Sequence, residues 1–105
     1  MTPTEPKLGL NELAQIVHEI AKSKGFWDQE RNDGELIALM HSELSEALEV
    51  LRYPDHAEEP IETELADCII RILDFCAARD LDIEKAIERK IEKNKGRKWK
   101  HGKRF

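Results

Sequence analysis

The sequence has little of what marks several large classes of protein. Two cysteines occur among its 105 residues, which excludes a disulfide framework. No apolar run approaches the ~18 residues needed to cross a bilayer, and residues 1–7 have no apolar segment typical of a secretory signal. Runs of alternating β-branched residues are also missing, so strands are not expected. We therefore expect one cytoplasmic domain built from helices.

Charge is distributed unevenly along the chain. Residues 89–105 contain nine Lys or Arg and a single acid, so this segment carries a charge of +8. The other 88 residues carry −13, which brings the net charge to −5. An acidic body with a basic end suggests that the body binds a cation and the end binds an anion. The alternative is a solvated acidic surface joined to a nucleic-acid-binding tail.

Hydrophobic residues recur at helical spacing in four segments. The predicted helices cover residues 10–24, 33–52, 60–79 and 82–95. Asp33 and Asp82 are the expected N-caps, and Pro60 suits a first helical residue. Short connections predict antiparallel neighbours, hence an all-α, four-helix bundle-like fold. Such long helices in so short a chain leave apolar surface uncovered, so we expect a homo-oligomer.

The domain is predicted to cover residues 10–96. Residues 1–9 are predicted to form a flexible leader, because they contain two prolines and no helical pattern. Residues 97–105 form a basic tail without clear periodicity, which we assign to the same domain.

Two central helices each carry a pair of acids spaced i, i+3, on or beside the apolar face. The pairs are Glu43 with Glu46 and Glu64 with Asp67. If the helices pack antiparallel, the four carboxylates converge. Their mutual repulsion when ionised costs about 10 kcal/mol, which is similar to the whole stability of a small domain, ~5–15 kcal/mol. They must then be protonated, paired with bases or bound to a hard cation, Mg²⁺ or Mn²⁺. The alternative is ordinary surface ion pairs, such as Asp67 with Arg71.

The last helix carries polar residues on its apolar stripe. Lys90, Asn94 and Arg97 project there, which favours a bound phosphate; alternatively, the two basic side chains extend out to solvent from a fraying helix end. In the loop before the second helix, Trp27 could stack on a nucleobase or anchor the loop. His18 falls on a helix flank and is assigned no catalytic role.

These features resemble the MazG-like all-α nucleoside triphosphate pyrophosphohydrolases. The resemblance rests on an E-x-x-E motif at residues 43–46, an E-x-x-D motif at residues 64–67, the Gly-Phe-Trp-Asp segment at residues 25–28 and the basic closing stretch from residue 90. It implies a dimer or tetramer, Mg²⁺ on the four acids, and phosphate contacts from Lys90, Asn94 and Arg97. It also implies cleavage of a nucleoside triphosphate into a monophosphate and pyrophosphate.

The chain departs from the family pattern just before each acid motif. Many relatives have a further acid where this chain has Ser42 and Thr63. In some of them that acid is the proposed general base, so here Glu46 or a metal-bound hydroxide is left for that role. Phosphoribosyl-ATP is an alternative substrate, because phosphoribosyl-ATP pyrophosphohydrolase has the same fold and uses bound metal in the same way. A non-enzymatic helical module that binds nucleic acid through its tail is the second alternative, although the acidic body would repel a polyanion.

Overall fold

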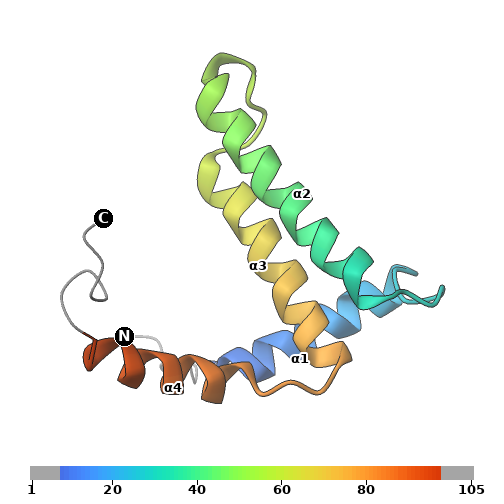
Figure 1. The fold of residues 1–105 in the computed structure, drawn as a ribbon. Coiled ribbons are helices and arrows are strands. Elements are labelled where there is room, and N and C mark those ends of the chain that lie inside the picture. Colours follow the sequence, from blue (N-terminus) through green and yellow to red (C-terminus); the bar gives the residue numbers. More distant parts are fainter. Residues whose placement is uncertain (1–7, 98–105) are drawn as a thin grey trace, which may run out of the picture.

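The computed structural model describes residues 8–97, and this part of the chain is helical without strands. The helices are α1 (Leu10–Ser23), α2 (Asp33–Arg52), the short 3-10 helix η1 (Pro54–His56), α3 (Ile61–Ala78) and α4 (Ile83–Lys95). Figure 1 shows their arrangement. The four predicted segments are confirmed to within one residue at each end. Most of the predicted leader (1–9) and tail (97–105) lies outside the described residues.

Local capping explains where α2 and α4 begin. The Asp82 side chain accepts a hydrogen bond from the Lys85 amide at 3.0 Å, as predicted. The predicted cap of α2, Asp33, is wrong by one residue. Asn32 has the extended backbone of an N-cap and accepts from the Glu35 amide at 2.8 Å. Asp33 is already helical, and its carboxylate instead accepts from Nε of Arg79, the residue that follows α3, at 2.7 Å.

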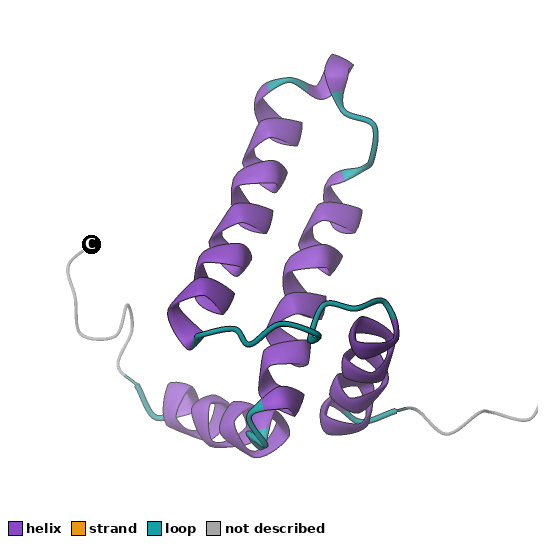
Figure 2. Ribbon diagram, turned by 90° about the vertical axis from the view of Figure 1, so that its right-hand side faces the viewer, coloured by secondary structure: helices purple, strands orange, loops and turns teal. Residues whose placement is uncertain are grey.

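The long helices α2 and α3 form an antiparallel hairpin that stands on α1 (Figures 1 and 2). Helix α1 packs across the second half of α3, where Ala14, Leu73 and Ala77 form the buried core. Ile83, at the start of α4, packs against the same core. Helix α4 contacts α1 near the first residues of both helices, and the rest of α4 leads away from the hairpin (Figure 1).

The hairpin leaves much of its apolar surface uncovered in a single chain. Leu36 and Ala47 are buried on α2. Many other large apolar side chains on the hairpin are exposed: Ile37, Leu44, Leu48, Leu51, Leu65, Ile69 and Ile70. The all-helical fold is thus confirmed, but one chain does not complete the packing of a four-helix bundle. None of the described helices is both long and apolar enough to cross a membrane.

Candidate metal and phosphate site

Carboxylates from both helices of the hairpin meet where α2 and α3 face each other. Glu43 on α2 and Glu64 and Asp67 on α3 each offer an oxygen atom, and these atoms all lie within 4.8 Å of one another. We call these three residues the acid cluster. The predicted convergence is therefore found for three of the four acids. Glu46 lies outside the acid cluster and lines, with Glu64, a cavity of about 500 Å³ that extends toward η1.

The members of the acid cluster differ in their exposure to solvent. Glu43 is only 9% exposed, because its helical position lies inside the apolar face of α2. Glu64 is partly buried, and Asp67 and Glu46 are exposed. An ion held by the acid cluster would thus contact the protein at Glu43 and remain accessible from the side of Asp67.

One arginine reaches into the acid cluster. Arg71 Nε donates to Glu43 Oε1 at 2.6 Å, from α3 to α2. The alternative pairing of Arg71 with Asp67 along α3 is not made. Within residues 8–97, no ion pair is found for Glu46, Glu64 or Asp67, so the negative charge at the site exceeds the positive charge. Four ionised carboxylates and one guanidinium leave three negative charges there.

The electrostatics of Glu64 reflect this excess. Partial burial is the largest cause that raises the pKa of Glu64, followed by the negative charges of Glu46, Asp67 and Glu43 and, more weakly, Glu59. No cation is among the causes. Carboxylates that disfavour one another's ionisation are stabilised when a cation binds between them.

The acid cluster fits a hard divalent cation. Its donors are carboxylate oxygens from two helices, which is the ligand type that Mg²⁺ and Mn²⁺ prefer. Neither cysteine belongs to it, since both are buried elsewhere on α3. Both the donor chemistry and the unbalanced charge therefore support the predicted metal position, with Glu46 beside it.

A second cavity, of about 270 Å³, opens on the other side of the acid cluster. Glu43, Asp67 and Arg71 line it together with residues nearer α1: Ala21, Phe26, Ile70 and Asp74. Two guanidinium groups lie over the Phe26 ring, that of Arg31 3.9 Å and that of Arg71 5.8 Å from its centroid. This cavity thus joins the charged acid cluster to an aromatic wall.

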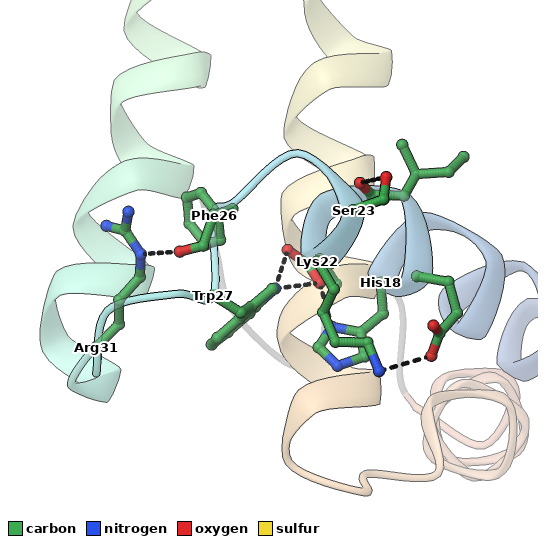
Figure 3. A network of polar contacts seen from close by, with 9 residues as sticks. His18, Lys22, Ser23, Phe26, Trp27 and Arg31 are labelled. Carbon is green, nitrogen blue, oxygen red and sulfur yellow. Dashed lines mark hydrogen bonds and ion pairs between the residues drawn. The ribbon is translucent and has the colours of Figure 1, made fainter.

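Trp27 is anchored close to this cavity by a buried carboxylate that the sequence analysis missed. Its indole Nε1 donates to Asp74 at 3.0 and 3.1 Å, and His18 Nδ1 lies 2.6 Å from the same carboxylate. Figure 3 shows the Trp27 and His18 rings directed toward it from the loop and from α1. Asp74 follows Asp67 by seven residues on the same stripe of α3, and that spacing was an available signal.

The basic row on α4 is placed apart from the acids within one chain. Lys90, Asn94 and Arg97 lie on the predicted stripe of α4 but are all exposed in a single chain, so they do not face the core of the chain that carries them. The reason is that α4 packs against α1 and leads away from the part of the hairpin with the acids (Figure 1). Trp99 and the rest of the basic tail lie outside the described residues.

Comparison with known proteins identifies this combination of helices. The family model described as the MazG nucleotide pyrophosphohydrolase domain matches residues 31–101. The match includes α2, α3 and α4, and thus all four acids and the basic row of α4. It begins after Trp27. No curated protein and no solved structure matches the chain.

Proposed function

The chain belongs to the MazG nucleotide pyrophosphohydrolase family, and we propose that it is a Mg²⁺-dependent enzyme that hydrolyses a nucleoside triphosphate to a monophosphate and pyrophosphate. The observation that carries this proposal is the acid cluster, which joins Glu43, Glu64 and Asp67 within 4.8 Å across the hairpin. Three carboxylates that converge on a helical hairpin can hold a hard cation, and Mg²⁺ held by carboxylates commonly also binds substrate phosphates.

In this proposal Glu43, Glu64 and Asp67 hold Mg²⁺, for which Mn²⁺ can substitute, and Glu46 lies beside them on the next turn of α2. When bound, the cation neutralises negative charge on the phosphate oxygens and acts as a Lewis acid. Glu43 fixes one side of the site rigidly because it is buried. Asp67 faces solvent, from where a nucleotide enters.

We assign the general base to Glu46. Its carboxylate lies outside the acid cluster but shares a cavity with Glu64, so it can contact a water molecule rather than the cation. In the reaction, water attacks one of the two phosphorus atoms that the α–β bridging oxygen joins, and Glu46 accepts the water proton. The α–β phosphoanhydride bond breaks, and the products are pyrophosphate and the nucleoside monophosphate. Such phosphoryl chemistry depends mostly on positioning and charge neutralisation.

The proposed phosphate ligands are Lys90, Asn94 and Arg97. Because α4 leads away from the acids of its own chain, these residues can serve a site only if a second copy brings α4 to it. A homodimer or homotetramer is therefore part of the proposal, and the exposed apolar side chains of the hairpin support it. Trp27 is the proposed nucleobase contact, with its position fixed by Asp74.

A pair of variants on α3 tests the proposed activity. Asp67→Asn keeps the size of an exposed side chain and removes one of the charges that hold the cation, so pyrophosphate release should fall at least about 100-fold. Glu62→Gln removes a charge from an exposed residue outside the acid cluster and should leave the rate unchanged. Circular dichroism of both variants checks that the helices are intact. Wild-type turnover by Asp67→Asn would refute the proposal.

We also propose a cytoplasmic location. Both cysteines are free thiols, Cys68 and Cys76, and free thiols are typical of reducing compartments.

A further inference from the structure

The ion pair between Arg71 and Glu43 occupies a position that the proposed metal also needs. Glu43 is the most buried member of the acid cluster, with 11% of its side chain exposed. A buried carboxylate is stable only when it is paired or binds a cation. Within residues 8–97, Arg71 is the single ion-pair partner of the acid cluster, at 2.6 Å.

A divalent cation that binds in this arrangement meets a positive charge that is already there. To bind all three members of the acid cluster it must bond to an oxygen of Glu43, whose carboxylate already faces the positive guanidinium. Two cations that share one carboxylate at such close range repel each other strongly in a partly buried site. This repulsion favours movement of the guanidinium away from Glu43 as the metal arrives.

The structure offers space for that movement. The side chain of Arg71 is 34% exposed, whereas that of Glu43 is nearly buried, so the arginine is the more mobile partner. Arg71 also lines the cavity of about 270 Å³ that contains the Phe26 ring. Its guanidinium already lies over that ring, 5.8 Å from the centroid, so a cation–π contact can hold it when it leaves Glu43.

We infer that Arg71 is a resident counter-cation that holds Glu43 in the metal-free protein and must be displaced before a divalent cation can bind. The inference rests on the proposed function, because it takes the acid cluster as the metal site. It assigns Arg71 a regulatory role at that site: it stabilises the metal-free fold and lowers the affinity for metal. A residue that merely oriented Glu43 toward the metal would raise that affinity.

Manganese binding without turnover tests the inference. Binding of Mn²⁺ is measured by the loss of the free-ion electron paramagnetic resonance signal, for the full chain and for variants, with no nucleotide present. Arg71→Gln removes the competing charge, so it should bind Mn²⁺ about tenfold more tightly, the factor of an ordinary ion pair. Its melting temperature in chelator should fall below that of the wild type, because Glu43 loses its partner.

Two further variants make the result decisive. Arg52→Gln changes the net charge of the chain equally, at an exposed position on α2, and should bind Mn²⁺ as the wild type does. Arg71→Lys keeps a positive charge that reaches less far. It should bind Mn²⁺ with an affinity between those of the wild type and Arg71→Gln, and it serves as the test if Arg71→Gln does not fold in chelator.

Each result of the Mn²⁺ binding and melting measurements either supports or overturns the inference. Tighter Mn²⁺ binding by Arg71→Gln than by Arg52→Gln, together with a lower melting temperature in chelator, supports the inference. Equal or weaker binding by Arg71→Gln overturns it, and if the wild type still releases pyrophosphate in a metal-dependent way, the proposed function stands. Failure of the wild type to bind Mn²⁺ at all overturns both the inference and the metal site.

Discussion

At the scale of single residues, one carboxylate connects three parts of the molecule. Asp74 is 7% exposed on α3 and receives the Trp27 indole from the loop and the His18 ring from α1. Arg79 lies over the Trp27 ring at 5.7 Å and donates to the backbone oxygen of Arg31 at 3.0 Å. These contacts fix the loop that precedes α2, and with it the aromatic wall beside the acid cluster.

Replacement of Asp74 by Asn should loosen that loop. The amide accepts fewer hydrogen bonds and carries no charge, so the free energy of unfolding should fall by about 1–3 kcal/mol. In a Trp99→Phe background, Trp27 is the sole tryptophan, and its emission should shift to longer wavelength in Asp74→Asn. An unchanged emission spectrum and unchanged stability would show that Asp74 does not anchor Trp27.

Glu64 gives a prediction about pH. Its pKa is raised above the ordinary value of 4.5 in the folded chain, so the folded state keeps a proton that the unfolded state releases. Without metal, its contribution to stability is therefore lost as pH rises from about 4.5 through the raised pKa. Glu64→Gln does not titrate, so in chelator it should become more stable than the wild type across this interval.

Urea unfolding at a series of pH values measures this difference. Glu62→Gln, two residues away and outside the acid cluster, should follow the wild type at every pH. Added Mg²⁺ should reverse the order, because the wild type gains stability from metal binding and Glu64→Gln gains less. A stability difference that does not change with pH would contradict the assigned cause.

At the scale of elements, α4 is attached to α1 by a small polar junction. The Asn11 side chain donates to Asp82 at 2.8 Å, its backbone amide donates to Glu84 at 2.9 Å, and its side-chain oxygen accepts from the Glu84 amide at 3.3 Å. Few apolar contacts accompany these bonds, since Ile87 and Ile91 are exposed. The orientation of α4 thus depends on Asn11 more than on packing.

Asn11→Ala should release α4 without affecting the hairpin. Stability should fall by about 1 kcal/mol, the value of an ordinary hydrogen bond, and amide exchange in residues 83–95 should speed up. Residues 33–52 and 61–78 should exchange as in the wild type. Gln15→Ala, an exposed change on α1, is the control and should alter neither segment. Faster exchange throughout the chain would mean that α4 is integral to the core.

The limits of the helices were predictable from the sequence, whereas contacts between helices were not. Helix limits follow from local signals, namely apolar spacing and caps such as Asp82. Asn32 was missed as a cap because it stands directly before another good capping residue. The reach of Arg71 to Glu43 depends on the packing of α2 against α3, so it could not be separated in advance from the pairing with Asp67.

The acid cluster itself was predictable because polar residues inside an apolar helical face are costly. Glu43 shows this most clearly, since its predicted position in the apolar arc of α2 corresponds to its burial. The same logic failed for Lys90 and Asn94, because α4 covers little of its own chain. An apolar stripe identifies a buried face only if another element is there to bury it.

At the scale of the whole molecule, the uncovered apolar surface supports the proposed assembly. Leu48 is 45% exposed on α2 and Ile69 is 53% exposed on α3, on the hairpin that carries the acid cluster. Many exposed large apolar side chains on one helical hairpin favour an interface. Together with the exposed basic row of α4, it favours an assembly in which copies complete one another's sites.

Leu48→Glu should reduce the molar mass of the assembly. An isolated chain would tolerate a charge at this exposed position, but an apolar interface would not. Light scattering after size-exclusion chromatography should show a larger species for the wild type and monomer for Leu48→Glu. Ser45→Glu adds the same charge one turn earlier and away from the apolar face, so it should assemble normally. A monomeric wild type at micromolar concentration would contradict the proposed assembly.

The most direct test of the proposed function is to identify the products formed from a panel of nucleoside triphosphates. With Mg²⁺, the account predicts a nucleoside monophosphate and pyrophosphate in equal amounts from at least one triphosphate, and no reaction in chelator. Nucleoside diphosphate and orthophosphate as products would contradict it, since that outcome places the cleaved bond elsewhere. Failure to cleave any triphosphate by the folded, metal-loaded protein would also contradict it, and phosphoribosyl-ATP would then be the next substrate to test.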